Sequence, residues 1–343
     1  SHKSEIVKPH YYSVYLADYN VTTELTTTER AAHFQFTFPE NEKSSLVIDA
    51  FDKGSYIILI SSENKIIGYT TRNSGGVPAN FKNYFVMIFD KAFDTNYTWR
   101  DAILEQDQLE LQDNHVGAIV TFKTKNGEKI NVRVASSFIS FEQAELNLKS
   151  ELGNKTFDQT VAESKKEWNK VLSSVAIEGG SEEQLKTFYS CLYRTTCFPQ
   201  KQYEIDSKGK IVHYSPYNGK VLAGYMYAGT GFWDTFRALY PLLNLVYPSI
   251  NEEMQEGLVN AYKEGGFLPE WSSPGFRNVM VGNNSASVVS DAYIKGLRGY
   301  DINTLYKALL NGANNEGPMD AVGRRGVKYY NTLGYVPYDV KIN

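Results

Sequence analysis

The hydrophobic period of the sequence changes at one place, and this change decides the fold class. The stretch "INVRVASSFIS" (130–140) alternates apolar and polar residues and is rich in β-branched side chains, which is typical of a half-buried strand. The overlapping stretch "SFEQAELNLKSEL" (140–152) has apolar residues at helical spacing, and Ser140 is a good N-cap. We therefore expect strands before residue 140 and helices after it.

Short strands dominate the part of the chain before this change. Turn clusters such as "FDKG" (51–54) and "TKNGEK" (124–129) separate them. Many short strands without intervening helices predict an antiparallel β-sandwich over residues 1–139. Besides 130–140, the predicted strands are "HFQFTF" (33–38), "SLVIDA" (45–50), "SYIILISS" (55–62), "KIIGYTT" (65–71), "YFVMIF" (84–89) and "GAIVTFKT" (117–124).

Helical periodicity continues from residue 140 toward the C-terminus. A second helix within 156–175, with Thr156 as its N-cap, completes a predicted helical linker over 140–180. For residues 181–343 the pattern predicts a succession of helices joined by long polar loops, with no strands between them. The signals are capping boxes at Ser181/Gln184 and Ser249/Glu252, an N-cap at Asp301, a stop at Gly265-Gly266, and helices over 233–247, 249–264, 286–299 and 301–312.

The composition excludes several classes of protein. A formal net charge of −4 gives no basic field for a nucleic acid, and no apolar run reaches the roughly 18 residues of a membrane span. Cys191 and Cys197 do not form a disulfide framework, and the five histidines have no metal-ligand spacing. The 25 Tyr, 18 Phe and 4 Trp instead suit a ligand with flat C–H faces and many hydroxyls.

The stretch "GTGFWDTFRALYPLL" (229–243) places an indole, a carboxylate and a guanidinium at the start of a helix. Asp234 would cap this helix and pair with Arg237 if the segment were an ordinary capped helix. Trp233 and Asp234 would instead form the wall of a ligand site if the N-terminal end of this helix faced a cleft. The residues alone leave these two interpretations evenly balanced.

A second candidate loop lies within "GGFLPEWSSPGFRNVMVGNNSASVVSDAYIKG" (265–296). Trp can stack on a sugar face, while Arg, Asn and carboxylates bond vicinal hydroxyls. Its turn at 283–285 is alternatively only a helix cap, and Asp291 with Lys295 predicts a surface ion pair. The candidate ligand-binding residues of this loop are Glu270, Trp271, Arg277, Asn278 and Asn284.

No complete catalytic set is present in these loops. The stretch "GRRGVKYYNTLGYVPYD" (323–339) lacks the phosphate-loop pattern, and we expect it to pack against the helices. Glycoside hydrolysis needs two carboxylates that flank the scissile bond. Asp234 and Glu270 are the only loop carboxylates with aromatic neighbours, and the sequence does not give their separation.

At these residues the sequence resembles the glycoside hydrolase family 92 α-mannosidases. "FWDTFRALYPLLNLVYP" (232–248), the 265–296 stretch and the 323–339 stretch are similar to successive blocks of that family. "SHKSEIVKPHYYSVYLADYNVTTELTTTERAAHFQFTFP" (1–39) looks like its sandwich domain, and "IEGGSEEQLKTFYSCLYRTTCFP" (177–199) like the entry into its helical domain. The resemblance covers nearly the whole chain.

The resemblance implies a β-sandwich followed by an (α/α)6 toroid, of which 181–343 would be the N-terminal part. It implies calcium-dependent, inverting, exo-acting hydrolysis of α-mannosidic linkages, α-1,2 linkages in particular, by an exported protein, periplasmic or on the cell surface, with mannose-containing glycans as partners. Trp233 and Asp234 match a pair that lines the terminal mannose pocket, and Arg277, Asn278 and the turn at 282–285 match its completing block. Many members have His where this chain has Asn284.

The resemblance also implies what this chain lacks. The family's catalytic acid and base, with most calcium ligands, are expected after the "GYVPYD" block (334–339), and the sandwich is expected to begin earlier than "SHKSE". We therefore expect an internal segment that contributes substrate-binding residues, no catalytic pair and no activity alone. Two alternatives are a non-catalytic glycan-binding protein and a different sandwich-plus-toroid glycosidase or phosphorylase acting on α-glucosides.

Overall fold

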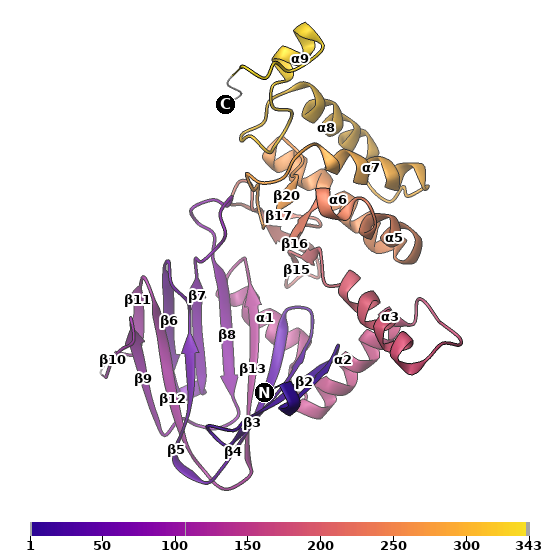
Figure 1. Ribbon diagram of the computed structural model, residues 1–343. Helices are drawn as coiled ribbons and strands as arrows, with labels where there is room; N and C mark the ends of the chain where they lie inside the picture. Colours follow the sequence, from indigo (N-terminus) through magenta and orange to yellow (C-terminus); the bar gives the residue numbers. More distant parts are fainter. Residues whose placement is uncertain (1, 107, 341–343) are drawn as a thin grey trace. The chain divides into compact units, whose positions relative to one another are not determined.

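The computed structural model describes residues 2–106 and 108–340, and the chain divides into two compact units (Figure 1). The first unit comprises the chain up to Arg72 together with Lys82–Ser174. The second comprises Asn73–Phe81 and the chain from Val175 onward. The connection Asn73–Phe81 therefore belongs to the second unit, although it joins two strands of the first.

The first unit is an antiparallel β-sandwich, as predicted. All strand pairs in its two sheets are antiparallel. The nine-stranded sheet has the order β1 (Glu5–Lys8), β2 (Tyr11–Leu16), β3 (Val21–Thr27), β4 (Ala31–Phe38), β13 (Glu128–Ser137), β8 (Asn83–Phe89), β7 (Lys65–Thr70), β6 (Ser55–Ile60) and β11 (Glu110–Asp113). The four-stranded sheet has the order β10 (Ile103–Glu105), β9 (Thr95–Arg100), β12 (Val116–Thr124) and β5 (Asn41–Asp49).

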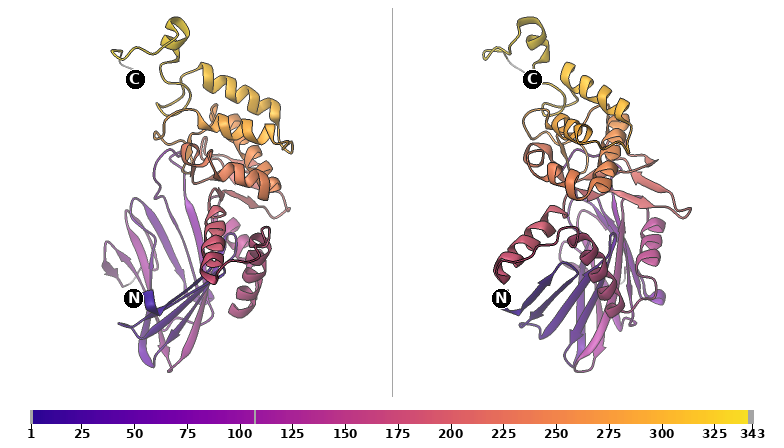
Figure 2. Two further views of the ribbon diagram at one scale, coloured as in Figure 1. Left: turned by 45° about the vertical axis from the view of Figure 1, so that its right-hand side comes forward. Right: turned by 90° about the vertical axis from the view of Figure 1, so that its right-hand side faces the viewer.

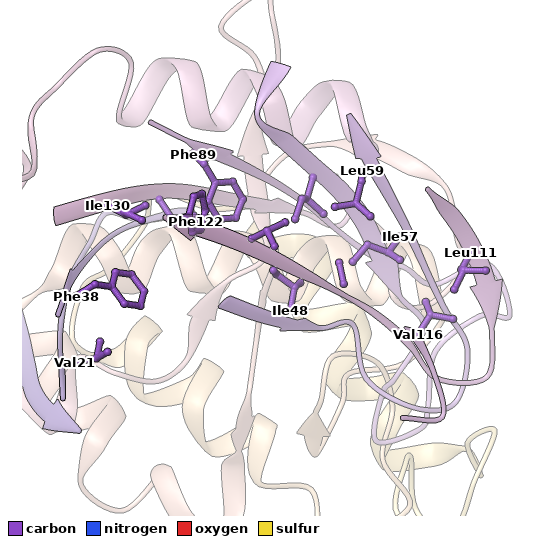
Figure 3. Close-up of a cluster of buried hydrophobic side chains, with 14 residues drawn as sticks. Val21, Phe38, Ile48, Ile57, Leu59, Phe89, Leu111, Val116, Phe122 and Ile130 are labelled. Carbon is purple, nitrogen blue, oxygen red and sulfur yellow. The ribbon is translucent and has the colours of Figure 1, made fainter. Parts of the chain in front are cut away.

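The core of the sandwich lies between the two sheets (Figure 3). Alternate residues of β6 are buried, which is the period-2 pattern of a strand with one face in the core. Phe122 of β12 is fully buried and contacts Phe89 and Phe93 at ring-centroid distances of 6.0 and 5.9 Å. This apolar layer holds the sheets together by the area that it removes from water.

Two helices of the predicted linker pack on the nine-stranded sheet. α1 (Phe141–Glu151) begins at the predicted N-cap Ser140, and its Ala144 and Leu148 lie in a cluster with Val86 and Ala135. α2 (Phe157–Leu172) begins with a capping box at Thr156. Both helices belong to the first unit, and α2 is packed against β3 and β4.

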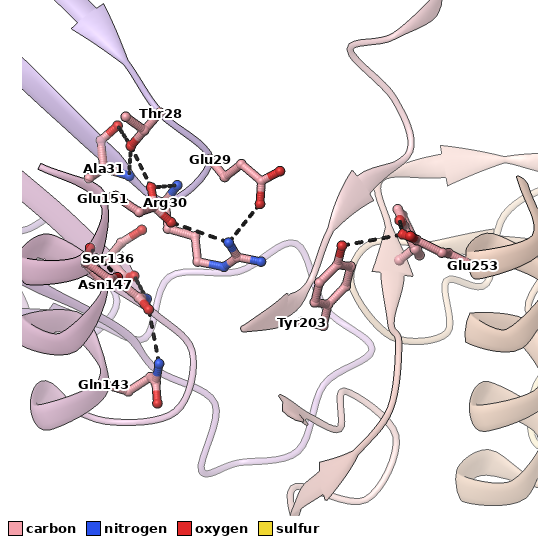
Figure 4. A network of polar contacts seen from close by, with 12 residues as sticks. Thr28, Glu29, Arg30, Ala31, Ser136, Gln143, Asn147, Glu151, Tyr203 and Glu253 are labelled. Carbon is pink, nitrogen blue, oxygen red and sulfur yellow. Dashed lines mark hydrogen bonds and ion pairs between the residues drawn. The ribbon is translucent and has the colours of Figure 1, made fainter. Parts of the chain in front are cut away.

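Polar contacts join α1 to the neighbouring strands and turn of the first unit (Figure 4). Glu151 of α1 accepts a hydrogen bond of 2.5 Å from Thr28 Oγ1 and pairs with Arg30 at 3.3 Å. Asn147 donates from Nδ2 to the carbonyl oxygen of Ser136 at 2.9 Å. His33, buried beneath α2, has its pKa lowered to about 4 because burial disfavours its charged form.

The second unit contains helices and several short strands, so the expectation of no strands there is wrong. The strands are β14 (Gln200–Lys201), β15 (Tyr203–Ile205), β16 (Ile211–Tyr214), β17 (Val221–Ala223), β18 (Tyr227–Ala228), β19 (Thr230–Gly231) and β20 (Trp271–Ser272). The helices are α3 (Glu182–Thr195), α4 (Phe232–Thr235), α5 (Leu239–Val246), α6 (Pro248–Gly265), α7 (Asn284–Ile294), α8 (Ile302–Asn314) and α9 (Val327–Leu333). α5 to α8, drawn in orange to gold, lie side by side in Figure 2, around a core that includes Leu258, Val288 and Leu305.

Most predicted helix ends are confirmed. α3 has the capping box of Ser181 and Gln184, α8 begins at Asp301, and α6 ends at Gly266 in the left-handed conformation. The capping box at Ser249/Glu252 is wrong, because Pro248 occupies the first turn of α6. Glu252 Oε1 instead accepts hydrogen bonds of 2.9 Å from the backbone N–H groups of Arg298 and Gly299.

The structure also tests the predictions of one continuous helix, of an ion pair, of unpaired cysteines and of no membrane span. The predicted helix over 233–247 is interrupted, because α4 ends at Thr235 and α5 begins at Leu239. Asp291 and Lys295 form the expected ion pair at 2.8 Å, and both cysteines are free. No helix among the described residues is long and apolar enough to cross a membrane.

Candidate functional site

A two-residue strand pair brings the two candidate loops together. Gly231 of β19 pairs with Trp271 of β20, and Thr230 pairs with Ser272. The N–H of Phe232 donates to the carbonyl oxygen of Glu270 at 3.0 Å. The "FWD" and "PEW" motifs, almost forty residues apart in the sequence, therefore lie side by side.

The ring of Trp271 and the carboxylate of Asp234 converge over Gly231. A Cβ atom at Gly231 would lie 2.6 Å from Trp271 Cε3 and 3.1 Å from Asp234 Oδ2. Distances below 3.0 Å are not tolerated, so the ring can approach this closely only because the residue beneath it is glycine. Asp234 is exposed, and its carboxylate accepts no hydrogen bond within the described part of the chain. The result is an aromatic surface with a free charged acceptor beside it.

Trp233 lies next to this pair and is half exposed, at 41%. The guanidinium of Arg237 lies 4.6 Å from the centroid of its indole and 4.5 Å from the ring of Phe236. Arg237 also donates from Nη1 to the carbonyl oxygen of Trp233. These contacts fix the orientation of the indole by a cation–π interaction.

The interpretation of this segment as an ordinary capped helix does not hold. The N-cap of α4 is Gly231, which has no side chain to accept a hydrogen bond. Among residues 2–106 and 108–340, Asp234 forms no ion pair with Arg237, whose guanidinium lies over the rings of Trp233 and Phe236. The carboxylate of Asp234 is therefore left to face solvent.

Glu270 lies behind this surface and not on it. Its side chain is 2% exposed, and Oε2 accepts hydrogen bonds from the backbone N–H groups of Asn284 and Ser285 at 2.6 and 3.1 Å. Its Oε1 is 2.6 Å from the hydroxyl of Ser285. Burial raises the pKa of Glu270 to about 7, although the three hydrogen bonds oppose this rise. In this geometry Glu270 caps the N-terminus of α7 and lies behind the Trp271 surface, and its role in sugar binding stays a prediction.

The remaining candidate residues lie in the loop that follows β20. The N–H of Arg277 donates to the carbonyl oxygen of Trp271 at 3.2 Å. Asn278 Oδ1 accepts from the N–H of Ala321 at 2.9 Å, and Asn283 Nδ2 donates to the carbonyl oxygen of Gly323 at 3.0 Å. Asn284 Nδ2 donates to the carbonyl oxygen of Val281 at 2.7 Å, so its amide closes the local turn. The structure thus ties this loop to the 315–326 segment.

Two supporting residues were missed by the sequence analysis. Gly231 permits the close approach of Trp271, and Ser285 holds Glu270 in place. Both lie beside residues that the sequence did single out. The signal that was available is the glycine directly before "FWD", because a glycine there allows another chain segment to cross closely.

Comparison with known proteins identifies the family. The sequence profile described as "glycosyl hydrolase family 92 N-terminal domain" matches residues 1–137, and that of the "glycosyl hydrolase family 92 catalytic domain" matches residues 143–343. The chain belongs to glycoside hydrolase family 92. This confirms the resemblance found in the sequence.

Solved structures and a curated relative agree with this assignment. An inverting mannosidase of family GH92 from Bacteroides thetaiotaomicron is 43% identical and superimposes with a TM-score of 0.95, over 99% of this chain and 46% of that one. A GH92 α-mannosidase from the same organism, in complex with mannoimidazole, is 27% identical with a TM-score of 0.87, over 99% of this chain and 45% of that one. An uncharacterized secreted glycosidase from Arthroderma benhamiae is 25% identical over 96% of this chain and 42% of its own length. The chain therefore spans less than half the length of these relatives.

The described residues do not form a metal site of their own. No three His, Cys, Asp or Glu side chains in residues 2–106 and 108–340 lie close enough together to hold a metal ion. The side-chain donors near the surface of Trp271 and Asp234 are also too few for Ca²⁺, which takes six to eight oxygen ligands. This part of the chain alone does not fit a calcium site.

Proposed function

We propose that this chain is part of an exo-acting α-mannosidase and that it contributes one wall of the pocket for the terminal mannose. The observation that carries the proposal is the convergence of the Trp271 ring and the free Asp234 carboxylate over Gly231. The names of two GH92 neighbours, both mannosidases, support mannose as the sugar. The wall consists of Trp233, Asp234, Trp271, Arg277, Asn278 and Asn284, with Glu270 behind it.

The chemistry of this wall suits a pyranose. The C–H groups of one sugar face can pack on an indole, while a carboxylate accepts hydrogen bonds from two neighbouring hydroxyls. Asp234 needs no other partner in the free protein, so binding a hydroxyl pair does not break an existing interaction. The indole of Trp233, held by Arg237, adds a second apolar surface beside it.

The catalytic acid and base are proposed to come from other residues of the protein. Inverting hydrolysis needs two carboxyl groups about 6.5–9.5 Å apart, on opposite sides of the scissile bond. Asp234 is one exposed carboxylate, but Glu270 is committed to the N-terminus of α7. We therefore propose no hydrolysis by this segment alone. For the whole enzyme we propose inversion, which the name of one GH92 neighbour, an inverting mannosidase, supports, and α-1,2 preference, which rests on the family resemblance.

Calcium dependence, the (α/α)6 toroid and export remain parts of this proposal. The ligands for calcium would come largely from outside these 343 residues. The secreted relative from Arthroderma benhamiae supports export, and mannose-containing glycans are the proposed partners.

Binding and hydrolysis test the proposal separately. The present chain is titrated with methyl α-mannoside and methyl α-glucoside by NMR, alongside its Trp271→Ala, Asp234→Asn and Asp18→Asn variants, the last changing an exposed carboxylate of the first unit. We expect mannoside-dependent shifts that the first two variants lose and the third keeps. Equal shifts with Trp271→Ala and Asp234→Asn would refute the wall.

The whole protein decides between the remaining functions. It is assayed on α-mannosides and α-glucosides with and without a chelator. Chelator-sensitive release of mannose supports the proposal. Binding without release favours the non-catalytic glycan-binding alternative, and chelator-insensitive release of glucose favours the α-glucosidase alternative.

A further inference from the structure

The connection between β7 and β8, Asn73–Phe81, packs against the loop that carries Trp271 and Arg277. Figure 1 shows this violet connection running beside β17 and β20. Ser74 Oγ is 3.2 Å from Ser273 Oγ. Asn80 accepts a hydrogen bond of 2.9 Å from the hydroxyl of Tyr214 and donates to the carbonyl oxygen of Gly219 at 2.9 Å.

The closest of these contacts are backbone against backbone. A Cβ atom at Gly76, whose φ is +74°, would lie 1.7 Å from the carbonyl oxygen of Phe276. A Cβ atom at Gly275 would lie 1.8 Å from the carbonyl oxygen of Gly76 and 2.7 Å from that of Pro216. No side chain fits at either glycine unless the backbone moves. The connection and the loop are therefore in contact without any intervening side chain.

The part that is contacted is the tip of a small hairpin. Ser272 pairs with Phe276, the N–H of Ser273 donates to the carbonyl oxygen of Gly275 at 3.0 Å, and that of Arg277 donates to Trp271 at 3.2 Å. On the other side, the ring of Phe276 packs on Tyr217 at 4.7 Å. The base of this hairpin carries Trp271 and Arg277, so a shift of its tip moves both side chains.

We propose that Asn73–Phe81 is a positioning element that holds the 271–277 hairpin, and with it the sugar-facing ring of Trp271. The connection does this by backbone contact at Gly76 and by the contacts of Ser74 with Ser273, without itself contacting the sugar. The Asn80 hydrogen bonds anchor the connection itself to the 214–219 segment. The mechanical part of this proposal stands on the contacts alone. Its consequence for affinity rests on the proposed function.

Hydrogen exchange of the 271–277 segment tests the mechanical part. Gly76→Ala is compared with Gly127→Ala, which has nearly the same φ, +75°, but no neighbouring atom within 4 Å. Both substitutions introduce the same backbone strain, so only the loss of the contact differs. We expect at least tenfold faster exchange of 271–277 in Gly76→Ala and unchanged exchange in Gly127→Ala. Equal exchange in the two variants would overturn the proposal.

A milder variant covers the case in which Gly76→Ala does not fold. Ser74→Ala removes the contacts of the Ser74 hydroxyl with the carbonyl oxygen and the hydroxyl of Ser273, and is compared with Ser45→Ala, which changes an exposed serine of β5. We expect a severalfold acceleration of exchange in 271–277 for the first and none for the second. If Gly76→Ala does not fold and Ser74→Ala leaves hydrogen exchange of 271–277 unchanged, the positioning role is refuted.

Kinetics of the whole enzyme test the consequence for the sugar. Gly76→Ala is expected to raise KM for an α-mannoside at least fivefold while kcat changes less, because the reacting groups are not displaced. A loosened hairpin with an unchanged KM would refute the sugar-wall assignment and leave the positioning element standing. An unperturbed hairpin would refute the positioning element, whatever the activity.

Discussion

Glu270→Gln is expected to make the second unit more stable above neutral pH. The carboxyl group is buried, and its pKa of about 7 in the folded protein exceeds the ordinary value of 4.5. Its contribution to stability is therefore fully present below pH 4.5 and is lost as the pH rises through about 7. A difference of roughly 2.5 pKa units corresponds to about 3 kcal/mol across this range.

Two opposing effects act on the carboxylate of Glu270, and their balance determines the sign of the expected change in stability. The N-terminus of α7 favours a negative charge, with a typical gain of about 0.3–2 kcal/mol. Burial favours the neutral form, and the raised pKa means that burial wins. Gln reproduces the protonated acid, because its NH₂ group can donate to the hydroxyl of Ser285 and its oxygen can accept from the two backbone N–H groups.

Urea unfolding between pH 4.5 and 8.5, followed by tryptophan emission, measures the effect. We expect Glu270→Gln to be within about 1 kcal/mol of the parent near pH 4.5 and about 3 kcal/mol more stable above pH 8. Glu316→Gln, an exposed carboxylate in the same unit, serves as the control and should follow the parent throughout. Destabilisation by Glu270→Gln at every pH would show that the helix N-terminus, and not burial, controls this group.

Two further substitutions test the convergence at Gly231 and the buried histidine of the sandwich. Gly231→Ala should push the ring of Trp271 away from Asp234, because the new Cβ atom would lie 2.6 Å from the ring. Calorimetry should show at least tenfold weaker binding of an α-mannoside. An unchanged affinity would contradict the convergence of Trp271 and Asp234 over Gly231. In the parent protein, burial and then Arg133 lower the pKa of His33 from 6.5 to about 4, so the folded state loses stability as the pH falls through this range. His33→Gln has no imidazole to protonate and should not show this loss. Acid unfolding followed by circular dichroism checks this, and identical acid midpoints would refute it.

The sandwich was predictable because the period-2 pattern is local. A strand such as β6 buries alternate residues in a single core, and this pattern survives in the sequence. β9 was not predicted, because "TNYTWR" becomes a strand through its neighbours: Trp99 lies so close over Gly117 that a Cβ there would be 2.2 Å from the ring. Cross-strand packing of this kind has no signal in a single segment.

The interruption between α4 and α5 lies just before Pro241, which has no N–H to bond the carbonyl oxygen of Arg237 and disfavours a helix continued through that turn. In a continuous helix the N–H of Arg237 would bond to the carbonyl oxygen of Trp233. The side chain of Arg237 takes this acceptor instead, and its guanidinium lies over the indole. Phe232, at the start of α4, is held by the carbonyl of Glu270 from another part of the chain. Pro241 and these contacts together oppose a continuous helix here, and only the contact of Phe232 with Glu270 comes from another part of the chain.

The candidate site divides into residues that the sequence could identify and residues that it could not. Trp271 and Asp234 were candidates because an aromatic ring and an acid suit sugar binding, although for Asp234 the residues alone left an ordinary helix cap equally open. Glu270 has the same chemistry, and only its burial distinguishes it from Asp234. Gly76 lies in the strand-rich half of the chain, and nothing near it suggests contact with Phe276. The proposed sugar-binding surface is thus encoded locally, whereas its position is set by glycines whose partners are known only after folding. Variation at such glycines should change affinity without altering any sugar-facing side chain.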